Sequence, residues 1–276
     1  MKKIPCRHRG GFTLVEMMVA LAVFAIIIIL LASLITQIGS LWRSGRARVD
    51  NFTKARVCFD VLEEDLESAQ IGRGLPGFEN ASGTTTLTFY CSQPGPGSSR
   101  PLSLVGYRVV DTGEDYNLGL QRGSLGFGLN PAMTPFLTPG TPFPAPVSVS
   151  VPNADYEVVG PGIVRMDFRF MSQDGKTISR TMSWNPALPT SSSATVTVCL
   201  LVIDADTLTL LNQTSTYAQF LQQFDAATSS VTDNEVPYGQ WLAAVNTNST
   251  FTGLPGKLRS ALQVYERTIS LSPPSP

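Results

Sequence analysis

Histidine is almost absent from this sequence, because His8 is the only one among 276 residues. Catalytic triads built on histidine and the commonest metal sites therefore lack their central side chain after position 8. Serine is plentiful but forms no nucleophile-elbow pattern. We expect no catalytic residues, no metal site and no cofactor, so an exported enzyme is the least favoured function.

Cysteine is also scarce, with four in the chain. Cys6 lies before the first apolar run, and the other three have spacings that match no zinc site. If the chain is exported to an oxidising compartment, three cysteines leave at least one unpaired within the chain. Two alternatives stay open: one disulfide, or buried free thiols, among Cys58, Cys91 and Cys199.

Charged residues make up only 15% of the chain, whereas hydrophobic residues make up 43%, so a packed globular part is expected. Four of the 20 basic residues lie within the first eleven positions, and no acidic residue accompanies them. The remaining 16 basic side chains face 21 acidic ones. This balance gives no reason to expect nucleic-acid binding.

A long apolar run opens the chain, from Phe12 to Ile35, and Glu16 is its only charged residue. As a helix these 24 residues would be about 36 Å long. That length is enough to cross a hydrocarbon core of about 30 Å. A carboxylate within a membrane span costs roughly 2.5–3.5 kcal/mol, so Glu16 is either functional or a glutamate that reaches the headgroups.

The residues around the start of this run resemble the cleavage and methylation signal of type IV prepilins and type II secretion pseudopilins: Arg9-Gly10-Gly11-Phe12-Thr13-Leu14-Val15-Glu16. The resemblance implies a leader peptide over residues 1–11, removed by a prepilin peptidase that cuts between Gly11 and Phe12. It also implies N-methylation of Phe12 and a role for Glu16 in assembly with other pilin or pseudopilin subunits.

The basic leader predicts the orientation, because Lys and Arg flanks stay on the cytoplasmic side. We therefore expect a single span in the inner membrane with residues 12–35 as the transmembrane helix, the N-terminus cytoplasmic and the globular part periplasmic. An ordinary secretory signal is the competing interpretation. It is disfavoured because the run is too long and its exit, residues 36–39, has no small-residue cleavage site.

The helical period continues beyond the membrane run, because apolar residues recur at gaps of mostly three and four. They are Ile38, Leu41, Trp42, Gly45, Val49, Phe52, Ala55, Phe59, Leu62, Leu66 and Ala69. No proline interrupts residues 12–70. We therefore expect one helix, with an amphipathic continuation over residues 36–71 that packs on a sheet. The acidic residues near its end are interpreted as a solvated face: Asp60, Glu63, Glu64, Asp65 and Glu67.

Short β-like segments follow and predict an antiparallel domain over residues 84–204. They are Thr84–Cys91, Leu102–Val110, Leu118–Arg122, Ile163–Met171, Thr177–Trp184 and Thr195–Ile203, the last nearly all apolar and expected in the centre. In the fourth segment Val164, Met166, Phe168 and Phe170 alternate with Arg165, Asp167 and Arg169. A proline-rich insertion over residues 130–162 is expected to be an exposed excursion without a central strand.

The last 72 residues, 205–276, form a C-terminal extension that is helical first and extended last. Helices are predicted over Asp206–Leu211, Tyr217–Phe224 and Tyr238–Val245, and a strand over Leu262–Ser270, before a disordered tail rich in proline and serine. Its aromatic residues would serve core packing or an exposed binding patch: Tyr217, Phe220, Phe224, Tyr238 and Trp241.

The order of long helix, loop and antiparallel strands is similar to the α+β pilin-like fold. Arg56–Leu66, the segment from Val164 to Phe170, Trp184, Leu188-Pro189 and the segment from Val196 to Ile203 resemble the minor pseudopilin lettered J. The resemblance implies a structural subunit near the tip of a type II secretion pseudopilus or pilus-like filament, with no small-molecule substrate. The alternative is a membrane-anchored binding module that contacts an adhesin, DNA or an exoprotein.

The cleavage signal gives the first testable prediction. Co-expression with a prepilin peptidase should shorten the chain by residues 1–11 and leave a methylated Phe12. Gly11→Val should block cleavage, because a side chain there obstructs close approach of the backbone to the peptidase. Intact-mass analysis measures both, and cleavage at another peptide bond or equal cleavage of the variant would contradict the prediction.

Overall fold

A computed structural model describes residues 13–70, 86–96, 102–110, 119–126, 151–180, 193–247 and 249–271. The predicted leader and the predicted Gly11–Phe12 cleavage junction lie outside these ranges, as do the prolines between 131 and 146 and the tail after residue 271. The chain divides into two compact units, Met1–Arg46 and Ala47–Pro276. Among the described residues, those of the first unit form the beginning of one helix, and those of the second unit include all the strands.

Helix α1 (Leu14–Glu67) is continuous over 54 residues, which confirms the single long helix expected from the unbroken periodicity. Its last turn is attached to the first strand by backbone hydrogen bonds. The amide nitrogen of Gln70 donates to the Tyr90 carbonyl oxygen at 2.7 Å, and that of Ser92 donates to the Ser68 carbonyl oxygen at 2.9 Å. The helix therefore ends where the chain begins to pair with the strand.

Two four-stranded antiparallel sheets follow, which confirms the α+β class. Sheet A has the order β1 (Thr86–Cys91), β2 (Ser103–Val110), β3 (Gly119–Gly126) and β4 (Tyr156–Pro161). Sheet B has the order β6 (Ile178–Ser179), β5 (Ile163–Ser172), β7 (Ser193–Ile203) and β8 (Leu262–Ser270). The apolar strand β7 lies between β5 and β8, as its composition predicts.

The remaining helices are short. They are the 3-10 turn η3 (Asn153–Asp155) before β4, and α2 (Ala205–Gln213), α3 (Tyr217–Thr228), α4 (Tyr238–Asn246) and α5 (Leu258–Ala261) between β7 and β8. The three helices and the final strand expected in the C-terminal extension are all present. That strand, β8, pairs with β7 along its whole length, so the extension completes sheet B.

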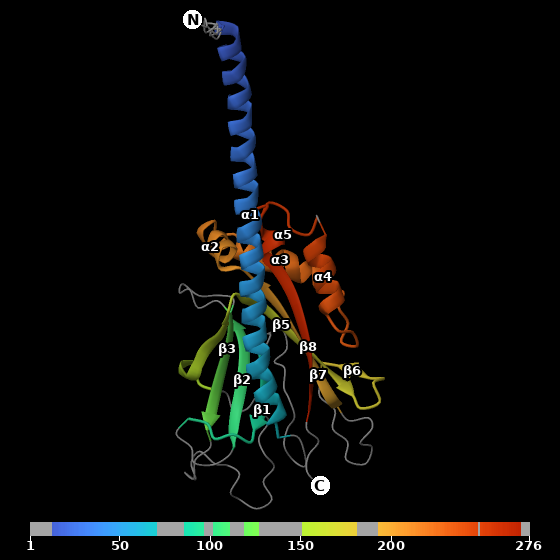
Figure 1. Cartoon of the computed structure of the whole chain (residues 1–276). Coiled ribbons are helices and arrows are strands. Elements are labelled where there is room, and N and C mark those ends of the chain that lie inside the picture. The colour runs from blue at the N-terminus through green and yellow to red at the C-terminus, as the bar shows by residue number, and fades with distance from the viewer. Residues whose placement is uncertain are drawn as a thin grey trace, which may run out of the picture. The chain divides into compact units, whose positions relative to one another are not determined.

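The main core lies between the second half of α1 and both sheets (Figure 1). The helix contributes Ala55, Cys58, Phe59, Leu62 and Leu66, and Ala69 follows just after its end. The sheets contribute residues of β1, β2, β3, β5, β7 and β8. Phe59 is 5% exposed, while Leu62 and Leu66 are completely buried. The burial of one helical stripe against two sheets confirms that the amphipathic segment packs on strands.

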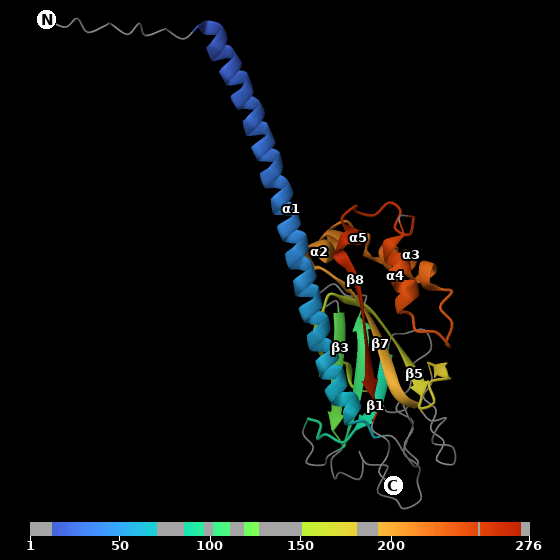
Figure 2. The same ribbon diagram turned by 45° about the vertical axis from the view of Figure 1, so that its right-hand side comes forward.

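A second core covers the other face of sheet B. Figure 2 shows α3 and α4 on the side of this sheet away from α1. Tyr217, Phe220, Phe224 and Trp241 are buried there against Val164 of β5 and apolar residues of β7. The aromatic residues of the extension therefore serve core packing, the first of the two uses that the sequence allowed.

Two glycines allow the backbone to pass between the sheets and under the helix. Gly162 joins β4 to β5 with φ +83°, and a Cβ atom there would lie 2.7 Å from the Ile203 carbonyl oxygen. At Gly160 a Cβ atom would lie 2.5 Å from Cys58 Sγ of α1. These contacts need the smallest residue, so the change from sheet A to sheet B depends on both positions.

Two local expectations are wrong, and one charged side chain of β5, Arg169, is buried although the alternation does not predict it. Residues 156–161 form strand β4, because only the earlier part of the insertion is dense in proline and the later part pairs with β3. The β5–β7 register shifts between Ile163 and Arg165, so Val164 joins the second core and Ile163 the first. Arg169 is 1% exposed, because both faces of sheet B are covered.

The apolar stripe of α1 is buried over a shorter length than expected, because its N-terminal part is exposed. Val49 is 64% and Phe52 55% exposed, although the Phe52 ring makes a tilted contact with Tyr265 at 6.0 Å between centroids. In the part of the stripe before residue 47, Ile38, Leu41 and Trp42 are exposed too. Within the 47–276 unit, the buried residues of α1 begin at Asn51, whose side chain donates to the Ala261 carbonyl oxygen of α5, and at Ala55, which belongs to the main core.

Two phenylalanines on one helix give the second prediction. In a fragment that begins at Trp42, Phe59→Ala should lower the free energy of unfolding by about 3–5 kcal/mol, because it leaves a cavity in the main core. Phe52→Ala should cost less than about 1.5 kcal/mol, since its ring is mostly exposed. Urea unfolding measures both, and equal losses would contradict the packing described for α1.

Candidate functional site

The first turn of α1 is closed by a reciprocal set of hydrogen bonds between Thr13 and Glu16. The Thr13 amide nitrogen and hydroxyl both donate to Glu16 Oε2, at 2.9 and 3.0 Å. In return the Glu16 amide nitrogen donates to Thr13 Oγ1 at 3.3 Å. Threonine before the helix and glutamate three residues later form a capping box, which satisfies amide groups that have no partner within the helix.

This cap explains how an apolar helix accommodates a carboxylate. Glu16 lies at the positive end of the helix dipole, where negative charge is stabilised, and its oxygen accepts two hydrogen bonds from Thr13. The Thr-Leu-Val-Glu spacing was visible in the sequence, but the reciprocal bonding was not anticipated. Gly11 and Phe12 lie outside the described residues, so the cleavage and methylation positions remain predictions.

The helix surface beyond the cap is apolar and uncovered. Large apolar side chains from Leu14 to Ile35 are between 46% exposed, at Ile27, and 76% exposed, at Leu14. The helix is long and apolar enough to cross a membrane, and none of its most apolar window is buried. An exposed apolar surface of this extent requires lipid or other helices around it, which is consistent with membrane anchoring.

The three cysteines after the leader are free and buried. Burial raises the pKa of each thiol, Cys58, Cys91 and Cys199, to about 12. Cys58 Sγ donates to the Val159 carbonyl oxygen at 3.4 Å, and Cys91 Sγ donates to that of Asp65 at 3.3 Å. Of the two alternatives the structure has the buried thiols, and a protonated buried thiol is a poor nucleophile.

The acidic residues near the end of α1 do not form one solvated face. The Asp65 side chain is 3% exposed and accepts two hydrogen bonds from Arg122 of β3, from Nε at 2.6 Å and from Nη2 at 2.9 Å. The Tyr107 hydroxyl also donates to Asp65. Burial, followed by the Asp65 charge, raises the pKa of Tyr107, so its hydroxyl stays a donor.

Asp65 could have been recognised from its position, because it lies on the apolar stripe three residues after Leu62. By contrast, Asp60 and Glu63 lie beside the stripe and each pair with Arg267 of β8 at 2.6 Å. These two pairs connect α1 to sheet B, and the Asp65–Arg122 pair connects it to sheet A. Among the described residues no group of three or more His, Cys, Asp or Glu side chains is placed to hold a metal ion.

Comparison with known proteins assigns the N-terminal segment. Residues 6–32 match the family model described as the prokaryotic N-terminal methylation motif. No curated protein sequence matches the chain. A type IV-like pilin from Thermus thermophilus is structurally similar with a TM-score of 0.35 and 12% identity, over 79% of this chain and 95% of that one. The comparisons therefore place a prokaryotic N-terminal methylation motif over the predicted leader and the beginning of α1.

The buried ion pair gives the third prediction. Asp65→Asn should lower the free energy of unfolding by about 3–5 kcal/mol, because it leaves the Arg122 guanidinium without its carboxylate. Asp60→Asn removes the same charge from a half-exposed side chain and should cost less than about 1 kcal/mol. Chemical unfolding of the fragment from Trp42 compares them, and a loss at Asp60 as large as that at Asp65 would contradict this assignment.

Proposed function

We propose that this prepilin-like chain is a minor pilin-like (pseudopilin) structural subunit rather than an enzyme. The observation that carries the proposal is the arrangement of its N-terminal segment. A capped helix begins at Leu14, two residues after Phe12, and its apolar first part lies within the methylation motif and is exposed. The helix can anchor the subunit and then associate with helices of other subunits, so the strand-containing unit is left free.

Processing is the first step of the proposed function. A prepilin peptidase removes residues 1–11, and the new N-terminal amine of Phe12 is methylated. Before cleavage the basic leader stays in the cytoplasm, the helix spans the inner membrane and the unit from Ala47 onward lies in the periplasm. The matched motif supports processing, and the charge distribution of the leader supports the orientation.

Assembly into a type II secretion pseudopilus or pilus-like filament, at or near its tip, is the next step. The resemblance to the J-type minor pseudopilin supports this position. Its matching segments occur at the end of α1, in β5 and in β7, and their apolar residues contribute to both cores. The matching residues at 184, 188 and 189 lie outside the described ranges.

A display role for the C-terminal extension has less support. A binding module was expected to present aromatic residues on this extension. Phe220, Phe224 and Trp241 are instead buried against sheet B, and Tyr238 is half-buried. The aromatic residues therefore stabilise the fold, and a structural subunit is the function that these observations favour.

Variants at the cap test the proposal. If Glu16 pairs with the Phe12 amine of a neighbouring subunit, Glu16→Ala should be cleaved and inserted normally but should not cross-link with partner pilins. Glu16→Gln can still close the capping box but lacks the charge, so it should also fail to cross-link. Thr13→Ala removes the capping hydroxyl and keeps the charge, so it should assemble.

In vivo cross-linking with co-expressed pilins, alongside intact-mass analysis, measures these outcomes. If Glu16→Gln assembles like the unmodified chain while Glu16→Ala does not, the carboxylate only caps the helix. If both variants assemble, Glu16 has no role in subunit contacts, and that part of the proposal is wrong.

A further inference from the structure

A pocket of about 300 Å³ lies within the 47–276 unit, between α1, helices α4 and α5, and the start of β8. Its volume is at the lower end of the range for small-molecule sites. Ten residues line it: Arg48, Leu242, Val245, Asn246, Arg259, Ser260, Leu262, Gln263, Val264 and Tyr265. Two are arginines and none is acidic, although the whole chain has a net charge of −1.

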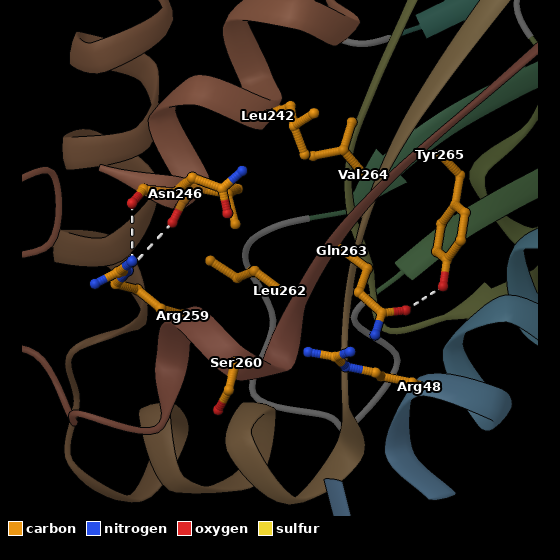
Figure 3. A pocket seen from close by; sticks show the side chains of 10 residues that line it. Arg48, Leu242, Asn246, Arg259, Ser260, Leu262, Gln263, Val264 and Tyr265 are labelled. Atoms are coloured by element: carbon orange, nitrogen blue, oxygen red, sulfur yellow. Dashed lines mark hydrogen bonds between the residues drawn. The ribbon is translucent and has the colours of Figure 1, made fainter. Parts of the chain in front are cut away.

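Two hydrogen-bond donors face each other in this pocket: the Gln263 side-chain amide nitrogen and the Arg48 guanidinium (Figure 3). The Tyr265 hydroxyl donates to Gln263 Oε1, which leaves the amide nitrogen of Gln263 facing the other way. Figure 3 shows this nitrogen and the guanidinium of Arg48 pointing toward one another. In the part of the chain that the structure describes, the Arg48 side chain has no hydrogen bond or ion pair, so both donors are available to an oxyanion.

The second arginine is already occupied. Arg259 donates from Nε to the Val245 carbonyl oxygen at 3.4 Å and from Nη2 to that of Asn246 at 2.8 Å (Figure 3). It thereby caps the C-terminal end of α4 and adds positive charge to one side of the pocket. Arg48 is consequently the guanidinium that can bind an anion directly.

One wall of the pocket is apolar, formed by Leu242, Leu262 and Val264. Leu242 is 38% exposed and, outside α1, is the one exposed large apolar side chain among the described residues. A small inorganic anion would leave this wall in water. A ligand with an anionic head and an apolar body would cover it, so the pocket fits an amphiphile.

The chain around Arg48 favours a membrane lipid as that amphiphile. No acidic residue occurs between Glu16 and Asp50, whereas Arg43, Arg46 and Arg48 do. Trp42, a residue type typical of membrane interfaces, precedes Arg48 by only six positions in the sequence. Arginines close to a bilayer surface are attracted to anionic lipids.

We propose that this pocket binds the phosphate of an anionic phospholipid. One phosphate oxygen accepts from the Arg48 guanidinium and another from the Gln263 amide, while the glycerol and upper acyl carbons contact Leu242 and Val264. The inference rests on the proposed membrane anchoring of α1, but it requires neither cleavage nor assembly. Incorporation of the uncleaved chain into lipid nanodiscs tests the anchoring separately.

Native mass spectrometry of the full-length uncleaved chain in a neutral detergent tests lipid binding, with phosphatidylglycerol and phosphatidylcholine as probes. Phosphatidylglycerol should bind about tenfold more tightly than phosphatidylcholine, and Arg48→Gln should abolish this preference, because a charge-assisted hydrogen bond is lost. Gln263→Leu should reduce it as well. Arg43→Gln, which removes the same charge outside the pocket, should change binding by less than about twofold.

Three outcomes would overturn the proposal. The first is equal binding of the two lipids. The second is a loss in Arg43→Gln as large as that in Arg48→Gln, which would mean that net charge alone attracts the lipid. The third is displacement of phosphatidylglycerol by millimolar inorganic phosphate at matched ionic strength, which would make free phosphate the ligand. Circular dichroism verifies folding, and if Arg48→Gln misfolds, Arg48→Lys replaces it and should keep part of the preference.

Discussion

The packing of the second half of α1 against both sheets is the interaction on which the strand-containing unit depends. Phe59, Leu62 and Leu66 belong to the same core as residues of β1, β2, β3, β5 and β7. Sheets A and B have no strand in common, so the helix is the element that covers an apolar face of each. Strand β7 is buried on both sides, by α1 on one and by the helices of the C-terminal extension on the other, which explains its nearly continuous apolar composition.

Apolar packing alone permits an amphipathic helix to rotate or slide, and the charged groups of α1 restrict both movements. Asp65 accepts from Arg122 in sheet A, while Asp60 and Glu63 pair with Arg267 in sheet B. The first pair is buried, so its net contribution to stability is small compared with the penalty for losing one partner. Its effect is to favour one rotation of the helix, the one that places Cys58 against the backbone of Gly160.

The beginning of the same helix meets a different requirement. In lipid each backbone amide must find a partner within the segment, and the first turn of a helix leaves several amides unpaired. The Glu16 carboxylate accepts from the Thr13 amide, and the Thr13 hydroxyl accepts from the Glu16 amide. The side chain that caps the helix is therefore also one that can carry a charge. The cap explains why an otherwise uncharged run tolerates this carboxylate, and the proposed pairing between subunits is compatible with it. In the described chain, no other element covers the exposed apolar side chains of this part of the helix, such as Leu14 and Ile27.

Local sequence determined the long helix, through its unbroken period, and most strands, through their alternation. It also determined the three C-terminal helices and the capped N-terminal motif. Each of these features depends only on residues within a few helical turns or one strand. Tertiary structure alone decided the positions that depend on distant partners. Asp65 is buried because Arg122, 57 residues later, reaches it; Arg169 is buried because the fold covers both faces of sheet B; and Val164 changes face through a register shift against β7. The pocket at Arg48 also depends on tertiary structure, because Arg48 of α1 and the pocket residues of β8 are more than 200 residues apart in the sequence. No local periodicity relates residues that far apart.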